Sequence, residues 1–177
     1  MTAAENLPPE QHPLITSQEN PAAMLAQFRL LAPQRFNKRS LHALVVEDQP
    51  FSRKMLHDAL RDFCTVDPAK DAHEGVKAYL KYPPHIAFLD IGLPDGSGHA
   101  MAALLRQLDP EAFIVMVTGN NSSDDVEAAM ANGVGGYIVK PFNKQKVMAC
   151  LEKYCSHHSG VSARSKIIGA AAGWAPP

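Results

Sequence analysis

The sequence predicts an α/β fold in which one doubly wound, five-stranded parallel sheet carries helices on both faces, with an additional helix near the N-terminus. Two observations support this prediction. Five short, mostly apolar segments alternate with five amphipathic segments over residues 41–155, and such alternation is typical of a parallel sheet. Several of the apolar segments also run continuously instead of alternating with polar residues, as expected for strands covered on both faces.

Residues 1–39 are expected to form a flexible arm followed by an amphipathic helix. Pro, Gln, Asn and Glu are frequent in residues 1–20, a composition typical of disordered segments. Asn20 is a good helix N-cap and Pro21 a favoured first helical residue. Residues 21–31 then carry an apolar stripe, which either docks on the same chain or pairs with a second copy in a homodimer. The stripe consists of Met24, Leu25, Phe28 and Leu31.

From residue 41 onward each predicted strand is followed by a predicted helix. The five strand segments are residues 41–48, 64–69, 85–90, 112–119 and 135–141. The helices are marked by apolar residues that recur three or four positions apart. Representative members of these stripes are Leu56, Val76, Leu104, Ala129 and Leu151. We assign residues 40–156 to one domain and residues 157–177 to a C-terminal tail.

Composition and charge argue against several classes of protein. The net charge is −1, so no broad basic field favours nucleic acid or an anionic membrane. The small basic cluster of Arg35, Lys38 and Arg39 is expected in a solvated linker. No apolar stretch reaches the ~20 residues that span a bilayer, the N-terminus lacks the apolar core of a secretory signal, and three cysteines without a Cys-x-x-Cys pair suit a reducing compartment. We therefore expect a cytoplasmic protein with no nucleic-acid or membrane partner.

Polar residues at the ends of four predicted strands would converge on one edge of the sheet, where such sheets bind their ligands. The acids are Glu47, Asp48 and Asp90, and the other two residues are Thr118 and Lys140. Three carboxylates held close together repel, so at least one would take up a proton unless a cation is bound. Mg²⁺ prefers oxygen ligands, and Lys140 offers a positive charge to a phosphate oxygen. The set therefore suits phosphoryl transfer to an aspartate.

These residues resemble the receiver domain of response regulators in two-component signalling systems. The matching residues are Glu47, Asp48, Asp90, Thr118, Lys140 and Pro141. Asp90 lies in the segment LDIGLPDGSG, which follows the acceptor-loop pattern of the family, and the interval from Thr118 to Lys140 is the usual one. The resemblance covers about residues 40–156 and implies a flavodoxin-like strand order of 2-1-3-4-5. It also implies a stand-alone regulator similar to chemotaxis regulators, here with an N-terminal extension.

The resemblance implies a role for each matching residue. Asp90 would accept a phosphoryl group from a histidine kinase or a histidine phosphotransfer protein. Mg²⁺ would be bound by Asp48, Asp90 and the main-chain carbonyl of Gly92, and by Glu47 through water. The protein would then be a phosphorylation-activated switch and not an enzyme, apart from slow autodephosphorylation.

Further residues are implied in binding the phosphate and in passing on the signal. Thr118 and Lys140 would contact the phosphoryl group, and Tyr137 would turn inward behind Thr118. The residues that flank the site would be Gly119, Asn120 and Pro141, the last following a bond that is often cis in the family. A downstream effector would bind the face formed by the fourth helix, the fifth strand and the fifth helix.

Three alternatives differ from this activated switch. The chain could act as an unphosphorylated receiver-like scaffold or phosphate sink, against which the complete acid set argues. An aspartate-nucleophile phosphatase would need a second acid two residues after the nucleophile, where Gly92 stands. An FMN carrier would need a hydroxyl- and glycine-rich loop after the first strand, where the segment EDQPFS is acidic.

Overall fold

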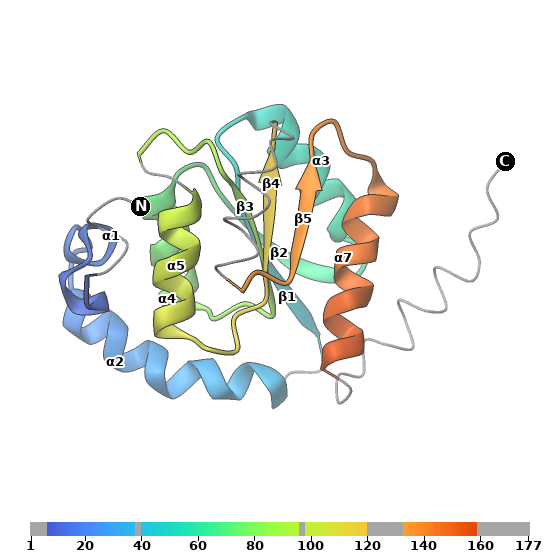
Figure 1. The fold of residues 1–177 in the computed structure, drawn as a ribbon. Helices are drawn as coiled ribbons and strands as arrows, with labels where there is room; N and C mark the ends of the chain where they lie inside the picture. The colour runs from blue at the N-terminus through green and yellow to red at the C-terminus, as the bar shows by residue number, and fades with distance from the viewer. Residues whose placement is uncertain (1–6, 38–39, 96–97, 120–132, 159–177) are drawn as a thin grey trace, which may run out of the picture.

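The computed structural model describes residues 7–37, 40–95, 98–119 and 133–158. Its centre is a five-stranded parallel sheet with the strand order β2-β1-β3-β4-β5 (Figure 1). The strands are β1 Leu41–Val46, β2 Cys64–Ala69, β3 Ile86–Asp90, β4 Ile114–Thr118 and β5 Gly136–Val139. The predicted α/β fold and the strand order implied by the family resemblance are therefore confirmed.

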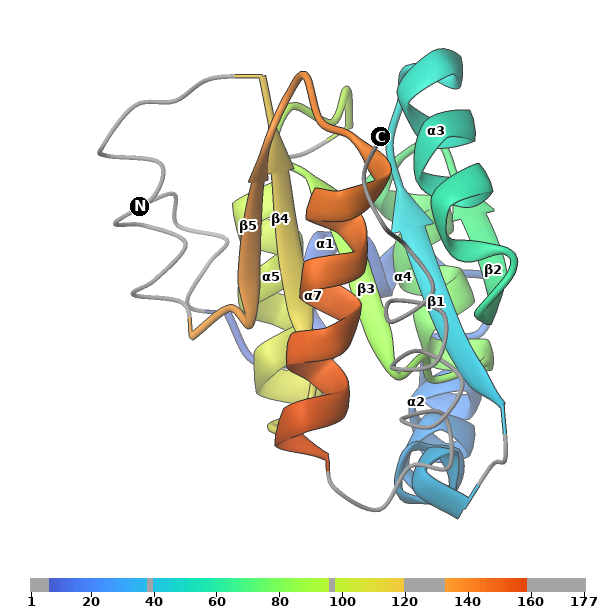
Figure 2. The same ribbon diagram turned by 90° about the vertical axis from the view of Figure 1, so that its right-hand side faces the viewer.

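Helices cover both faces of the sheet, with α3 and α7 on one face and α4 and α5 on the other (Figure 2). These helices are α3 Pro50–Leu60, α4 Ala72–Lys81, α5 Gly98–Leu108 and α7 Lys144–His157. Successive strand side chains point to opposite faces, so Phe88 enters the core under α3 and α7, whereas Ala87 and Leu89 enter the core under α4 and α5. The predicted helix around Ala129 lies outside the described residues.

Three of the longer helices begin at an Asn or Asp side-chain cap that the sequence provides. Asn20, Asp71 and Asn143 precede α2 (Pro21–Leu31), α4 and α7, and each accepts a hydrogen bond from the main-chain N–H three residues further on, at 3.2, 2.8 and 3.1 Å. Such caps satisfy N–H groups that have no partner within the helix. The predicted start of the N-terminal helix at Asn20 is thus confirmed.

The segment before α2 contains structure that the sequence did not predict. A 3₁₀ turn, η2 (Pro9–Gln11), leads into the short helix α1 (Pro13–Thr16). Leu14 and Ile15 are buried in the core under α4 and α5. The prediction of a flexible arm is therefore wrong for these residues, because two adjacent apolar side chains in a polar segment find a covered site on the domain.

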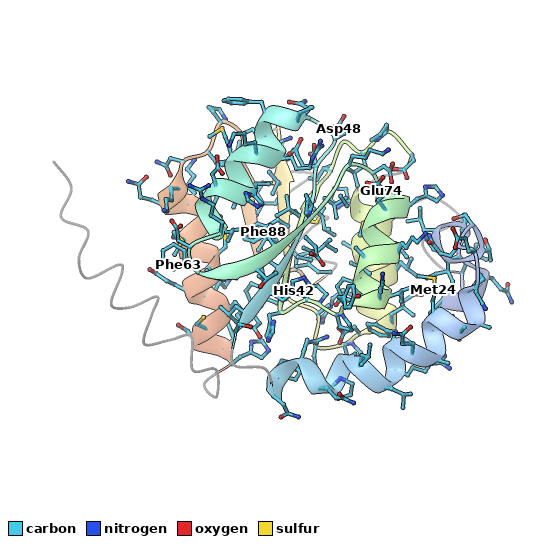
Figure 3. The ribbon with its side chains drawn as sticks, turned by 180° about the vertical axis from the view of Figure 1, so that it is seen from behind. Met24, His42, Asp48, Phe63, Glu74 and Phe88 are labelled. Atoms are coloured by element: carbon cyan, nitrogen blue, oxygen red, sulfur yellow. The ribbon has the colours of Figure 1, made fainter. Side chains whose placement is uncertain are left out.

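The apolar stripe of α2 docks on its own domain. Leu25 and Phe28 are buried, and the Phe28 ring centre lies 5.8 Å from that of Tyr79 on α4. Met24 packs on the same core from the side of α2 that faces the domain (Figure 3). Of the two alternatives for this stripe, docking within the chain is the one observed, and a homodimer would have to use residues other than the buried part of the stripe.

The predicted linker carries a buried cation. Arg35, in the 3₁₀ segment η3 (Ala32–Asn37), is 2% exposed, and its guanidinium pairs with Asp109, with Nη2 donating to Oδ1 at 3.1 Å. The Tyr79 hydroxyl donates to Oδ2 of Asp109 at 2.7 Å, and Nε2 of His85 lies 2.8 Å from the main-chain oxygen of Arg35. The prediction of a solvated linker is therefore wrong for Arg35, while the other two residues of its basic cluster lie outside the described ranges.

Two further features concern the chain as a whole. Cys64, Cys150 and Cys155 lie in the core under α3 and α7, and no disulfide joins them. Among the helices in the described ranges, none combines the length and the apolar character needed to cross a membrane.

Candidate functional site

Three carboxylates meet at the carboxyl edge of the sheet. Glu47 and Asp48 directly follow β1, and Asp90 ends the neighbouring strand β3. Parallel pairing of Val46 with Leu89 brings the two strand ends level. Each acid offers an oxygen that lies within 4.8 Å of those of the other two, and Figure 3 shows Asp48 at this edge of the molecule. The predicted convergence of the acids is therefore found in the structure.

Lys140 bridges two of the three acids. Its Nζ lies 2.7 Å from Oε2 of Glu47 and 2.9 Å from Oδ2 of Asp90. The main-chain N–H of Lys140 donates to the main-chain oxygen of Thr118, at the end of β4, at 2.6 Å. This hydrogen bond aligns the two segments. Glu47 and Asp90 are both buried, so these ion pairs are screened less by water than pairs on an open surface.

The electrostatics of the cluster favour an added cation. The pKa of Glu47 is raised to about 7, chiefly by burial; the charge of Asp90 also raises it, and Lys140 opposes both effects. Burial alone would lower the pKa of Lys140, but its hydrogen bonds to Asp90 and Glu47 outweigh burial and raise it. The Lys140 ammonium pairs with only two of the three carboxylates. Such a cluster suits a hard divalent cation such as Mg²⁺, which takes carboxylate oxygens as ligands and keeps several waters.

Three hydrogen bonds that the sequence did not predict hold the acidic turn in place. Nη1 of Arg53 donates to the main-chain oxygens of Glu47 and Asp48, at 2.5 and 3.1 Å. The main-chain N–H of Gln49 donates to Oε1 of Glu47 at 3.2 Å. Arg53 lies in the first turn of α3, and a cation one turn beyond an acidic pair is the signal from which this role could have been inferred.

The main chain turns tightly after Asp90. The N–H of Gly98 donates to the main-chain oxygen of Ile91 at 3.0 Å, and a Cβ at Gly98 would lie 2.1 Å from the main-chain oxygen of Asp90. At Gly92 a Cβ would meet nothing within 4 Å, and the Gly92 N–H lies 3.3 Å from Oδ1 of Asp90. The close approach of residue 98 to the main chain of Asp90 therefore requires glycine at that position. Position 92 has room for a side chain.

This difference predicts unequal effects of two alanine substitutions, one in the loop after Asp90 and one at the first residue of α5. We expect Gly98→Ala to lower the free energy of unfolding by about 1–3 kcal/mol, because the added methyl group forces the loop away from Asp90. Gly92→Ala should change it by less than about 0.5 kcal/mol, as for surface changes away from such features. Urea denaturation of both variants measures the difference, and equal stabilities would contradict the steric argument.

The remaining predicted residues lie around this cluster. Thr118 is buried at the end of β4, next to β3. Tyr137 on β5 is half-buried and packs on the core under α4 and α5. Gly119 is exposed, and Pro141 follows a cis peptide bond. Asn120 lies outside the described residues.

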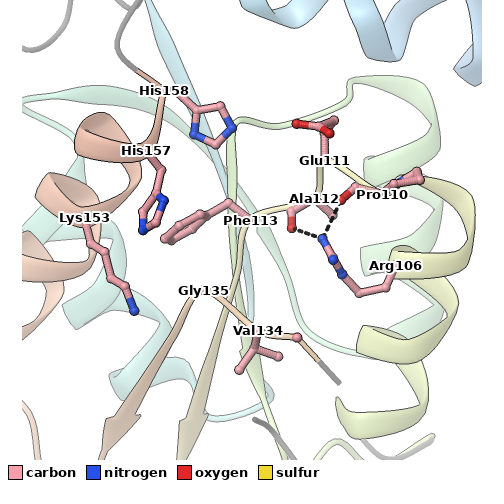
Figure 4. Close-up of a pocket in the computed structure, with 11 residues that line it drawn as sticks. Arg106, Pro110, Glu111, Ala112, Phe113, Val134, Gly135, Lys153, His157 and His158 are labelled. Carbon is pink, nitrogen blue, oxygen red and sulfur yellow. Dashed lines mark hydrogen bonds between the residues drawn. The ribbon is translucent and has the colours of Figure 1, made fainter. Parts of the chain in front are cut away.

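A pocket of about 450 Å³ lies at the opposite edge of the sheet (Figure 4). Lys153 and His157 of α7 stand on one side and Arg106 of α5 on the other, with Phe113 between them. Phe113 immediately precedes β4, so the pocket lies at the amino ends of the strands. It shares no residue with the acid cluster and is not part of the candidate site.

Comparison with known proteins agrees with this geometry. A family model for the response regulator receiver domain matches residues 43–152, which is more than half of the chain. The chain belongs to the response-regulator receiver family. The match begins at residue 43, after Arg35 in the chain. The N-terminal segment that docks on this receiver domain therefore lies outside the family-defined region.

Relatives of this receiver domain include regulators of two kinds. Chemotaxis protein CheY of Halobacterium salinarum is 33% identical over 106 residues, which cover 59% of this chain and 88% of the relative. CheY of Listeria monocytogenes is 34% identical over 115 residues, covering 64% and 97%. The virulence transcriptional regulatory protein PhoP of Salmonella typhimurium is 30% identical over 125 residues, covering 70% of this chain but 56% of PhoP.

Solved structures share the fold of this receiver domain. A CheY-like receiver domain protein from Methanospirillum hungatei superposes with a TM-score of 0.64 at 24% identity, covering 68% of this chain and 97% of the other. The chemotaxis response regulator CheY4 of Vibrio cholerae gives a TM-score of 0.61 at 24% identity, covering 65% and 98%. At these identities the likeness supports the fold.

Proposed function

We propose that this receiver domain is a phosphorylation-activated switch in which Asp90 accepts a phosphoryl group from a histidine kinase or a histidine phosphotransfer protein. The observation that carries the proposal is the convergence of Glu47, Asp48, Asp90 and Lys140 at one edge of the sheet. A carboxylate oxygen of Asp90 would form the new bond to phosphorus. The bond from phosphorus to the donor nitrogen would break, and that nitrogen would keep the electron pair.

The acids are also proposed to hold Mg²⁺. Asp48, Asp90 and the main-chain carbonyl of Gly92 would be direct ligands, and Glu47 would act through water. The bound ion would supply positive charge against the phosphoryl oxygens. Lys140, whose ammonium already contacts Asp90 at 2.9 Å, would move to a phosphoryl oxygen once Asp90 is modified.

The signal would leave the site through neighbouring residues. Thr118 would donate its hydroxyl to the phosphoryl group, and Tyr137 would become more buried behind it. The proposed output is a changed surface over the predicted helix around Ala129, β5 and α7. A downstream effector protein would bind this surface. Local modification can bias such a two-state element.

The proposed switch does not turn over a substrate as an enzyme does. Gly92 has no side chain to shield the phosphoryl group or to guide an attacking water, and the proposed autodephosphorylation is slow. We also propose a cytoplasmic location without nucleic-acid or membrane partners. Three buried cysteines without a disulfide support a reducing compartment, and the net charge of −1 supports the absence of nucleic acid.

Removal of the metal tests the proposed chemistry. We expect the chain to acquire one phosphoryl group when it is incubated with acetyl phosphate and Mg²⁺, and essentially none when EDTA replaces Mg²⁺, because three carboxylates otherwise repel the phosphoryl oxygens. Intact mass spectrometry measures the adduct. Absence of the adduct under both conditions would contradict the proposal and favour an unphosphorylated scaffold.

A further inference from the structure

The loop that follows the acceptor is tied to α4 by a carboxylate outside the acid cluster. Asp95 accepts hydrogen bonds from the main-chain N–H groups of Ala72 and His73, at 2.8 and 2.9 Å, and its Oδ2 also contacts Nδ1 of His73. Burial alone would raise the pKa of Asp95, but these hydrogen bonds outweigh burial and lower it. A charged side chain five residues after Asp90 therefore holds the first turn of a neighbouring helix.

The same turn of α4 packs on the strand that carries the other two acids. A Cβ at Gly75 would lie 2.8 Å from Cγ2 of Val46, so the glycine brings the main chain of α4 against β1. Val46 directly precedes Glu47, and the main-chain N–H of Glu47 donates to Ala69 at the end of β2 at 3.0 Å. The first turn of α4 thus packs on the residue that precedes Glu47 and also holds the loop that follows Asp90.

Asp95 is not the only side chain that caps α4. Asp71, the residue before the helix, already accepts the Glu74 N–H at 2.8 Å. Within the acceptor loop, Leu93 is buried, whereas Gly92 is exposed and has open space on its side-chain side. The path of the main chain at Gly92 therefore depends on how the loop is held at its two ends.

We propose that Asp95 is a positioning residue for phosphoryl transfer, holding the acceptor loop against α4 so that the main-chain carbonyl of Gly92 stays in place beside the acids. This inference rests on the proposed function, in which that carbonyl is a ligand of Mg²⁺. Asp95 itself touches neither the ion nor the phosphoryl group.

Two alanine variants at the same end of α4 test the proposal. Asp95→Ala and Asp71→Ala each remove carboxylate hydrogen bonds from the helix start, but only Asp95→Ala releases the acceptor loop. We expect Asp95→Ala to weaken Mg²⁺ binding about tenfold, the lower end of the range for residues that orient metal ligands. Asp71→Ala should bind Mg²⁺ as the wild type does. Titration calorimetry with MgCl₂ gives both dissociation constants.

The conservative variant Asp95→Asn keeps one oxygen acceptor and extends the test if Asp95→Ala does not fold. We expect it to weaken Mg²⁺ binding roughly threefold to fivefold, as for one lost hydrogen bond, and to slow phosphorylation by acetyl phosphate in proportion. Equal Mg²⁺ affinity in the wild type, Asp71→Ala and the Asp95 variants would overturn the positioning role. A wild-type chain that neither binds Mg²⁺ nor acquires a phosphoryl group would instead overturn the proposed function.

Discussion

The Asp90→Asn variant is expected to acquire no phosphoryl group from acetyl phosphate and Mg²⁺, under conditions in which the wild-type chain acquires one. A carboxamide is a poor nucleophile, and the substitution also removes a negatively charged ligand from the proposed metal site. The fold should persist, because asparagine has nearly the same shape and the change relieves repulsion with Glu47. Intact mass spectrometry measures the adduct, and circular dichroism checks the fold.

Two further variants serve as controls for this result. Asp58→Asn alters a surface acid of α3 that pairs with Lys54 at 2.6 Å, and it should acquire the phosphoryl group as the wild type does. Asp48→Asn keeps the acceptor but loses a proposed metal ligand, so the adduct should form more slowly and need more Mg²⁺. An adduct that persists in Asp90→Asn would show that another residue is the acceptor.

The second large effect concerns stability and lies at the other edge of the molecule. We expect Arg35→Met to lower the free energy of unfolding by about 3–5 kcal/mol, because Asp109 would remain buried without its cation. The N–H of Glu111 and the hydroxyl of Tyr79 would still donate to the carboxylate, but neither neutralises its charge. The midpoint and slope of a urea denaturation curve measure the loss.

Matched variants separate the buried charge from other effects of the substitution. Arg29→Met removes an exposed ion pair with Glu10 from the same N-terminal segment, and such pairs contribute about 0–1 kcal/mol. The double variant Arg35→Met/Asp109→Asn should be more stable than Arg35→Met alone, since it leaves no unpaired buried charge. If Arg35→Met and Arg29→Met lose the same stability, the buried pair does not anchor the segment.

The acid cluster could be predicted because parallel strands present their carboxyl ends at the same edge. Glu47, Asp48 and Asp90 each follow a continuous apolar run, and these runs are the strongest local signal in the chain. The resemblance to receivers supplied the strand order, which periodicity alone leaves open. Lys140 was found in the same way, at the end of the fifth strand.

The contacts that escaped prediction join segments far apart in the chain. Arg35 and Asp109 are separated by 74 residues, and neither belongs to a periodic pattern. Asp95 lies in a turn, where an acid is ordinarily explained by hydrogen bonds to the main chain of the same turn, and its partners on α4 become neighbours only when the sheet forms. Leu14 and Ile15 are too few to produce a stripe, so their burial depends on a surface that local sequence does not reveal.

The buried pair of Arg35 and Asp109 sets the smallest segment of this receiver domain that can be transferred to another protein. The family-defined segment begins at residue 43, whereas the cation that neutralises Asp109 is contributed by residue 35. A fusion protein that contains only the family-defined segment would keep Asp109 buried without the cation that neutralises it. Grafting this receiver onto another protein therefore calls for a junction upstream of Pro9, so that the wrap-around segment travels with the sheet it protects.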